Sequence, residues 1–276
     1  MPLASPHPNA RPRIGVFDSG LGGLSVLRAL RDRLPDVPCH YVADSGHAPY
    51  GERDDEHVLD RSTRIARHLV EAGAALIVVA CNTATAAAVA ALRDRWPAVP
   101  IVGLEPGLKP ALAATRNGRI GVMATRATLA SAKFTALLAR QPEPQRFHLQ
   151  PCDGLAGAIE ALPLDDPTVL DLVERHVDPL RDAGVDTIVL GCTHYAFVRE
   201  AIQVAIGPGA TLIDTADAVA RQTERLLKRI GRVVGEAQAA DAHPALVVET
   251  TGEPSRLNAA CRTWLALSGD ARRIVL

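Results

Sequence analysis

Two short stretches decide the fold of this chain: Val79-Ala80-Cys81-Asn82-Thr83 and Leu190-Gly191-Cys192-Thr193-His194. In each, an apolar run rich in β-branched residues ends at a cysteine, and small polar residues follow. Such runs are typical of buried parallel strands whose carboxyl ends face a ligand. Because the two cysteines occupy equivalent positions, the pattern predicts two thiols that enter one cleft from opposite sides.

The composition favours a large globular enzyme or binding protein over a nucleic-acid-binding protein. The chain has 276 residues, enough for one large or two smaller domains, and 47% of them are hydrophobic. The formal net charge is −1 and no dense basic run is present, which argues against a nucleic-acid partner. The five cysteines form no CxxC pair, so we expect reduced thiols and no disulfide scaffold.

Neither a targeting segment nor a membrane span is expected. Residues 1–12 are rich in proline and lack an apolar core, so they predict a disordered tail and no signal peptide. No apolar run reaches the roughly 18 residues that a transmembrane helix needs. The sequence therefore predicts a cytoplasmic protein without a membrane partner.

Predicted strands alternate with predicted helices along most of the chain. The strand at 13–17 leads into a glycine-rich turn, Asp18-Ser19-Gly20-Leu21-Gly22-Gly23, and a helix follows as far as Pro35. This alternation indicates an α/β fold of mostly parallel sheets flanked by helices. Right-handed crossovers then place the polar clusters at the carboxyl ends of the strands. Residues 235–276 look less regular, with a strand near 246–248.

A weak internal repeat predicts two similar lobes. Residues 14–19 resemble residues 120–125, and the two cysteine motifs are separated by a similar interval of about 110 residues. We expect residues 1–103 and 214–276 to form lobe one and residues 104–213 to form lobe two. The active site would then lie between the lobes.

Two thiols facing one carbon atom can invert a stereocentre. A free thiol has a pKa of about 8.5, within reach of neutrality, and a helix N-terminus or a cation favours the thiolate. Both Cys81 and Cys192 precede predicted helices, so we expect the helix dipole to favour their thiolates. One thiolate can remove a proton while the opposite thiol returns one, with neither a cofactor nor a metal.

The residues near the two cysteines suit a small substrate with carboxylate groups. Asp18 could accept a hydrogen bond from an ammonium group or orient a thiol, and His194 could assist proton movement. Cys192 and His194 alone are too few ligands for a metal site. Candidate hydrogen-bond donors are Ser19, Asn82, Thr83, Thr125, Thr128 and Thr193. Cys39, Cys152 and Cys261 are expected to be packing residues.

Five motifs in this order resemble the glutamate racemase family. They are Asp18-Ser19-Gly20-Leu21-Gly22-Gly23, Ala48-Pro49-Tyr50-Gly51, Ala80-Cys81-Asn82-Thr83-Ala84-Thr85, Glu105-Pro106-Gly107 and Leu190-Gly191-Cys192-Thr193-His194-Tyr195. The resemblance implies a cytoplasmic, cofactor-independent isomerase that supplies D-glutamate for peptidoglycan, and hence for the cell wall and cell shape. It also implies a homodimer.

The same resemblance implies roles for individual residues. Cys81 would act on D-glutamate and Cys192 on L-glutamate, assisted by Asp18 and His194. The loop of Pro49, Tyr50 and Gly51 would meet the side-chain carboxylate, largely through its backbone. The amino and α-carboxylate groups would be held by Ser19, Asn82, Thr83 and Thr193.

Two alternatives stay open at this point. The chain could be a racemase of aspartate or another acidic amino acid. It could also be a non-catalytic module that binds an amino acid on the same scaffold, although binding alone needs neither cysteine.

Overall fold

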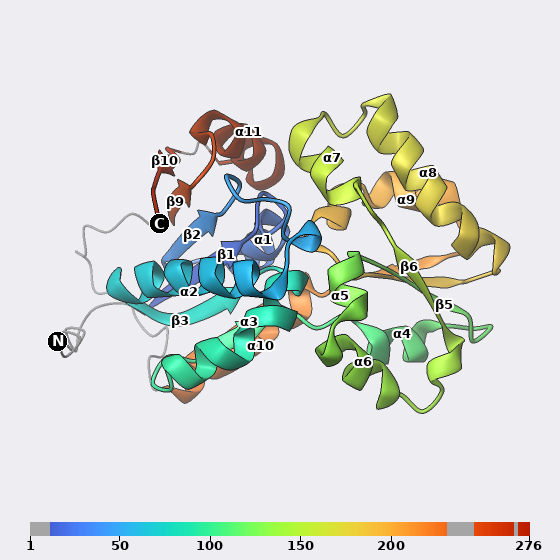
Figure 1. Cartoon of the computed structure of the whole chain (residues 1–276), viewed down its shortest axis with the longest axis horizontal. Coiled ribbons are helices and arrows are strands. Elements are labelled where there is room, and N and C mark those ends of the chain that lie inside the picture. The colour runs from blue at the N-terminus through green and yellow to red at the C-terminus, as the bar shows by residue number, and fades with distance from the viewer. Residues whose placement is uncertain (1–11, 231–245, 268–269) are drawn as a thin grey trace.

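Two parallel β-sheets, side by side in Figure 1, form the framework of the molecule. The computed structural model describes residues 12–230, 246–267 and 270–276, so the predicted tail at 1–12 lies almost wholly outside the described residues. The first sheet has the order β10 (Arg272–Arg273), β9 (Leu246–Thr250), β2 (Cys39–Ala43), β1 (Arg13–Asp18), β3 (Ala74–Val79), β4 (Ile101–Gly103). The second has the order β6 (Phe147–Pro151), β5 (Ile120–Ala124), β7 (Thr187–Leu190), β8 (Thr211–Ile213).

The two sheets share one strand order. β2-β1-β3-β4 in the first sheet corresponds to β6-β5-β7-β8 in the second, and all these pairings are parallel. The repeat seen in the sequence matches β1 with β5 and β3 with β7. The predicted α/β class, with two similar lobes of parallel sheets, is confirmed.

Helices cover both sheets. Those that pack around the first sheet are α1 (Leu24–Arg33), α2 (Asp55–Glu71), α3 (Asn82–Arg95), α10 (Ala216–Arg229) and α11 (Pro254–Leu265). Those of the second lobe are α4 (Leu108–Ala114), α5 (Arg126–Ala130), α6 (Ala132–Ala139), α7 (Leu155–Ala161), α8 (Pro167–Asp182) and α9 (Arg199–Ile206). Short 3₁₀ helices are η1 (Tyr50–Glu52), η2 (Pro144–Arg146) and η3 (Thr193–Ala196). Among the described helices, none is long and apolar enough to cross a membrane.

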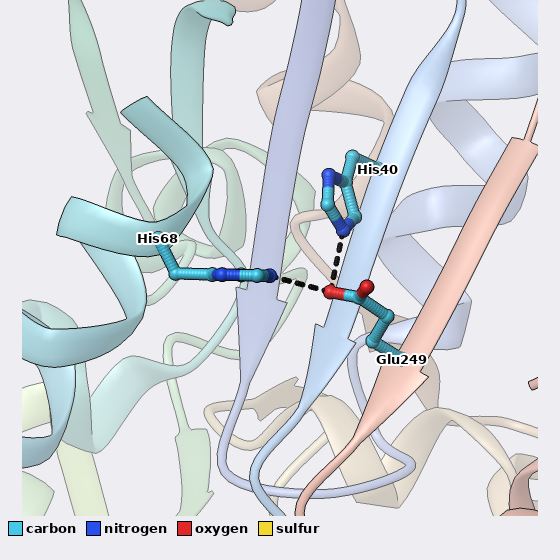
Figure 2. A group of neighbouring side chains, drawn as sticks. All are labelled: His40, His68 and Glu249. Atoms are coloured by element: carbon cyan, nitrogen blue, oxygen red, sulfur yellow. Dashed lines mark hydrogen bonds and ion pairs between the residues drawn. The ribbon is translucent and has the colours of Figure 1, made fainter. Parts of the chain in front are cut away.

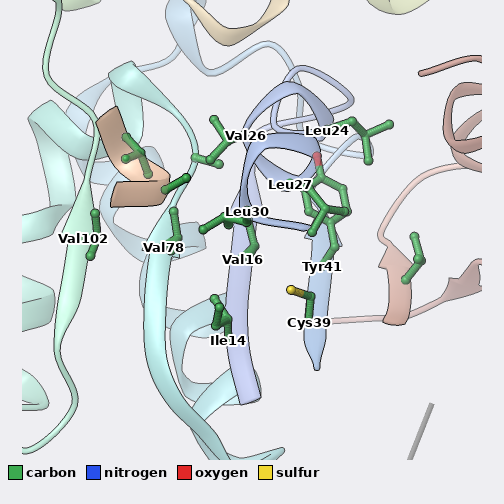
Figure 3. Close-up of a cluster of buried hydrophobic side chains, with 14 of the residues drawn as sticks. Ile14, Val16, Leu24, Val26, Leu27, Leu30, Cys39, Tyr41, Val78 and Val102 are labelled. Carbon is green, nitrogen blue, oxygen red and sulfur yellow. The ribbon is translucent and has the colours of Figure 1, made fainter. Parts of the chain in front are cut away.

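Apolar side chains pack on both faces of the first sheet. Figure 3 shows one face, where Leu27 and Leu30 of α1 lie over Ile14 and Val16 of β1. On the opposite face, residues of α2 and α3 pack against Phe17 and Val79. Because both faces are covered, the central strands β1 and β3 are buried along almost their whole length and largely apolar, as the sequence indicated.

The last part of the chain is more regular than predicted. Residues 254–265 form α11, which begins with Pro254 in its first turn, where the missing N–H costs no helical hydrogen bond. The predicted strand near 246–248 is part of β9. Residues 235–245 lie outside the described residues.

Candidate active site

A single pocket between the two lobes contains both cysteines of the opening motifs. It has an empty volume of about 360 Å³ and lies at the carboxyl ends of the strands of both sheets. Lobe one contributes the residues that follow β1, β2 and β3, and lobe two contributes those that follow β5 and β7. The lining residues are Ser19, Ala48, Pro49, Tyr50, Gly51, Cys81, Asn82, Thr83, Thr125, Ala156, Glu160, Gly191, Cys192, Thr193 and His194.

Cys81 lies between the end of β3 and the start of α3. Its sulfur accepts a hydrogen bond from the Ala84 N–H at 3.4 Å, so it caps the helix, and its thiol lies 3.7 Å from Ser19 Oγ. Burial and the nearby Asp18 charge nonetheless raise the pKa of Cys81 far above its ordinary value. The helix start does favour the Cys81 thiolate, because the Ala84 N–H lowers the pKa of Cys81, but desolvation outweighs this contribution in the free protein.

Cys192 stands on the other side of the pocket, after β7. The helix predicted behind it is the four-residue 3₁₀ helix η3, and the Cys192 side chain makes no capping hydrogen bond there. Its sulfur instead lies 3.7 Å from Nδ1 of His194. The titratable group next to this thiol is thus an imidazole, whereas the helix dipole has only one short turn to act through.

His194 links Cys192 to a carboxylate that the sequence did not reveal. Its Nε2 lies 2.6 Å from Oε1 of Glu160, which α7 carries into the pocket. Burial lowers the pKa of His194, but the hydrogen bonds to Cys192 and Glu160 outweigh burial, so the pKa lies well above its ordinary value. Cys192, His194 and Glu160 therefore form a chain along which a proton can move.

Asp18 provides a buried carboxylate on the Cys81 side. Its Oδ2 accepts hydrogen bonds from the Gly20 and Gly23 N–H groups, at 3.2 and 2.9 Å. Its Oδ1 is buried without a partner among the described residues. Burial raises the pKa of Asp18 to about 6, against the charge of His194. Asp18 can therefore change its protonation state near neutral pH.

Hydroxyl groups connect the lobes beside the thiols. Thr83 Oγ1 at the start of α3 lies 3.1 Å from Thr125 Oγ1, which caps α5, and 3.3 Å from Thr128 Oγ1. Thr83 and Thr125 line the pocket, whereas Thr128 supports them from behind. Asn82 lines the pocket with a buried Oδ1 that has no partner among the described residues.

The loop at 48–51 closes one end of the pocket. The Tyr50 hydroxyl donates to Asp44 Oδ2 at 2.6 Å, so it is already engaged within lobe one. A Cβ atom on Gly51 would lie only 2.8 Å from Thr125 Cβ, so glycine allows this loop to approach lobe two closely. The same holds for Gly22, where a Cβ would lie 2.6 Å from Thr193 Oγ1.

The remaining cysteines are buried and free, and none of them lines the pocket. The structure thus brings together all the predicted site residues except two that stand just behind the lining, Asp18 and Thr128. The lining also contains one ionisable residue that the sequence did not predict, Glu160. No sequence signal could have found it, because it lies within a helix without any motif around it.

The chain is similar in sequence to known proteins. Residues 24–223 match the family model described as Asp/Glu/Hydantoin racemase. The glutamate racemase of Ectopseudomonas mendocina is 53% identical over 214 residues, 78% of this chain and 81% of the relative. That of Ralstonia pickettii is 45% identical over 265 residues, 96% of this chain and 92% of the relative.

Solved structures show the same similarity. The glutamate racemase isoform RacE1 of Bacillus anthracis superposes with a TM-score of 0.84 at 31% identity, covering 96% of this chain and 98% of that chain. The Escherichia coli glutamate racemase, crystallised with L-glutamate and the activator UDP-MurNAc-ala, gives 0.83 at 30% identity, with coverages of 96% and 98%. This chain belongs to the Asp/Glu/hydantoin racemase family, and within it to the glutamate racemases.

Proposed function

We propose that this chain interconverts L- and D-glutamate with Cys81 and Cys192 as the two acid–base groups. The observation that carries the proposal is that both sulfurs line one polar pocket, each near its own acid–base group, Asp18 for Cys81 and His194 for Cys192. An amino-acid-binding module would need neither thiol.

The reaction requires one proton to leave the α-carbon and another to arrive on its opposite face. With L-glutamate, the Cys192 thiolate takes the α-proton, and the electron pair of the C–H bond moves into the α-carboxylate. The Cys81 thiol then protonates the α-carbon from the other side, which gives D-glutamate and leaves Cys81 as the thiolate. The reverse reaction exchanges the two roles.

Neighbouring groups reset the two thiols. Asp18, whose pKa is about 6, can exchange a proton with Cys81 near neutrality: it takes the thiol proton before D-glutamate reacts and returns it to the thiolate after L-glutamate has reacted. His194, held by Glu160, exchanges a proton with Cys192. Hydrogen bonds from Ser19, Asn82, Thr83 and Thr193 would stabilise the charge that develops on the α-carboxylate.

Both lobes contribute residues to the pocket, so each should contact part of the substrate. We propose that residues 1–103 with 214–276, and residues 104–213, act as the two lobes that close on the substrate. The loop of Pro49, Tyr50 and Gly51 would take the side-chain carboxylate through its backbone, with Thr125 opposite Gly51. The distance from this loop to the thiols would then select glutamate over the shorter aspartate.

The biological role follows from the product. We propose that the enzyme works in the cytoplasm and supplies D-glutamate for peptidoglycan. We also propose a homodimer, which light scattering on the purified chain would test; a mass of one chain at micromolar concentration would contradict it.

The reaction itself is tested in deuterated water. Incubated with L-glutamate, the protein should incorporate deuterium at the α-carbon and form D-glutamate, while aspartate should react far more slowly. Cys81→Ala and Cys192→Ala should each lower racemisation by at least about 10³-fold, since each removes one of two required acid–base groups. Cys261→Ala is the matched control, because this buried thiol lies outside the pocket and should leave turnover unchanged.

Turnover that survives in either pocket variant would refute the two-thiol mechanism. Deuterium exchange with aspartate but not with glutamate would show instead that the substrate assignment is wrong.

A further inference from the structure

Three side chains from separate elements of lobe one converge on a single oxygen atom, away from the pocket. Figure 2 shows His40 on β2, His68 on α2 and Glu249 on β9. The Nε2 atoms of His40 and His68 lie 2.7 and 2.6 Å from the same carboxylate oxygen, Oε2 of Glu249. None of the three lines the active-site pocket. The reaction proposed above makes no use of them.

Two imidazoles and one carboxylate are a common ligand set for zinc. One ligand atom from each residue lies within 4.8 Å of the other two. Tetrahedral Zn²⁺ binds nitrogen and oxygen at about 2.0–2.1 Å, which puts its ligand atoms roughly 3.3 Å apart. The two N–O distances would therefore widen by about 0.6 Å, and water would be the fourth ligand. Glu249 has a long side chain, and His68 lies in the last turn of its helix, so both can accommodate this shift.

The burial of the three side chains differs in a way that suits a metal site. The His40 side chain is only 5% exposed, Glu249 is 13% exposed and His68 is 28% exposed. An ion could therefore reach the site past His68, while His40 and Glu249 would shield it from water. The His40 and His68 rings also meet edge to face, with centroids 5.5 Å apart, which limits how far either ring can turn.

The charge of the three side chains also suits a divalent cation. Glu249 brings one negative charge into a largely buried position, and its ion-pair partners among the described residues are the two imidazoles, with no Arg or Lys side chain beside them. A neutral imidazole binds a metal through the lone pair of one nitrogen. A divalent cation would thus complete a set of ligands in which the carboxylate is the one anion.

We propose that His40, His68 and Glu249 form a structural binding site for one divalent transition-metal ion, with Zn²⁺ the best match. Bound there, the ion would join β9, which lies far along the chain, to β2 and to the end of α2. An ion that binds the folded chain but not the unfolded one raises stability by mass action. The expected effect is therefore on stability, and not on turnover.

The test must first remove the thiols that could bind zinc in the pocket. In a Cys81→Ser/Cys192→Ser parent, equilibrium dialysis with elemental analysis should find one Zn²⁺ per chain, and excess Zn²⁺ should raise the thermal unfolding midpoint. His68→Gln in this parent keeps a hydrogen-bond donor for Glu249 but removes a ligand. It should weaken Zn²⁺ binding by more than about 100-fold, the upper end of what loss of an outer-shell partner costs. Glu249→Gln should do the same.

His148→Ala is the matched control, because it removes an imidazole from β6 in the other lobe. It should keep both the bound zinc and the shift in the unfolding midpoint. Cobalt should give visible d–d bands without a sulfur charge-transfer band. The proposal is overturned if the parent takes up no zinc, or if His68→Gln binds zinc as tightly as the parent. These readouts do not depend on racemisation, and His68→Gln in the native background should still racemise glutamate.

Discussion

At the scale of single residues, the burial of Asp18 lowers the stability of the folded protein at neutral pH. Its side chain is fully buried, and one of its two oxygens has no partner among the described residues. A buried carboxylate of this kind disfavours its own charged form, which is why the pKa of Asp18 rises to about 6. This loss of stability accompanies the carboxylate that the proposed mechanism uses as the proton acceptor for Cys81.

Asp18→Asn should raise the free energy of unfolding while it lowers the rate of racemisation. Oδ2 accepts both backbone N–H groups, so an amide oxygen can replace it and the NH₂ group takes the place of the unpartnered Oδ1. Between pH 3.8 and about 6 the native state binds more protons at Asp18 than the unfolded state, so wild-type stability falls as pH rises through that window. Above it, the variant should be more stable by up to about 3 kcal/mol, measured by urea unfolding.

The same substitution has a kinetic readout. Racemisation of D-glutamate by the wild type, which needs the Cys81 thiolate, should fall as pH drops below about 6, where Asp18 becomes protonated. Asp18→Asn should lose about 10²- to 10⁴-fold in turnover and show no such limb. If the free energy of unfolding of the variant at pH 8 is no higher than that of the wild type, the buried Asp18 carboxylate does not destabilise the fold.

At this scale, the sequence predicted the two cysteines of the site but not Glu160. Cys81 and Cys192 could be found because each ends an apolar strand, and a strand end is a local pattern. Glu160 could not, because its role depends on α7 lying against His194, a contact between positions 34 residues apart. The pKa of Cys81 also escaped prediction, since burial is a property of the folded pocket.

At the scale of elements, α2 is held to the first sheet by two polar contacts as well as by its apolar face. His68 contacts Glu249, and about two turns earlier the Arg61 guanidinium binds both oxygens of Asp44, at 3.0 and 2.8 Å. Asp44 also accepts from Tyr50 and from Thr251 Oγ1. One buried carboxylate thus ties α2, the pocket loop and the end of β9 together.

Arg61→Leu should be strongly destabilising. Arg61 and Asp44 are 5% and 0% exposed, so the variant leaves an unpaired charge in the core, a loss that typically costs about 3–5 kcal/mol. Asp44→Asn/Arg61→Leu should recover part of this loss. Arg64→Leu on the same helix breaks the exposed pair with Asp60 and should cost at most about 1 kcal/mol. Equal losses for Arg61→Leu and Arg64→Leu in urea unfolding would contradict the account.

Prediction of elements from the sequence succeeded where strands are buried on both faces. β1, β3, β5 and β7 are buried, largely apolar runs followed by polar residues, so their positions followed from the pattern. β10, two exposed arginines, carries no such pattern and was not predicted. α11 was missed because it is amphipathic only in part and follows a segment of mixed composition. The partners of β9 could not be predicted either, since pairing with β2 joins residues about 200 positions apart.

At the scale of the whole molecule, the two lobes contact each other both beside the thiols and further from the pocket. Thr83 and Thr125 join the lobes beside the thiols. Further out, Phe197 after η3 stacks on Trp264 of α11, with ring centroids 3.5 Å apart and planes 10° from parallel. Phe197 also packs against the cores of both lobes. The indole of Trp264 is therefore placed to report the relative position of the lobes.

Glutamate binding should change the fluorescence of Trp264. Because Phe197 belongs to lobe two and Trp264 packs within lobe one, any rearrangement of the lobes around the substrate alters the stacked pair. The chain has two tryptophans, so Trp96→Phe leaves Trp264 as the one reporter, and Trp264→Phe is the matched control. Titration of Trp96→Phe with L-glutamate should give a saturable change in emission that Trp264→Phe lacks. Unchanged emission at saturating glutamate, in a variant that still racemises it, would show that substrate enters without any movement at this contact.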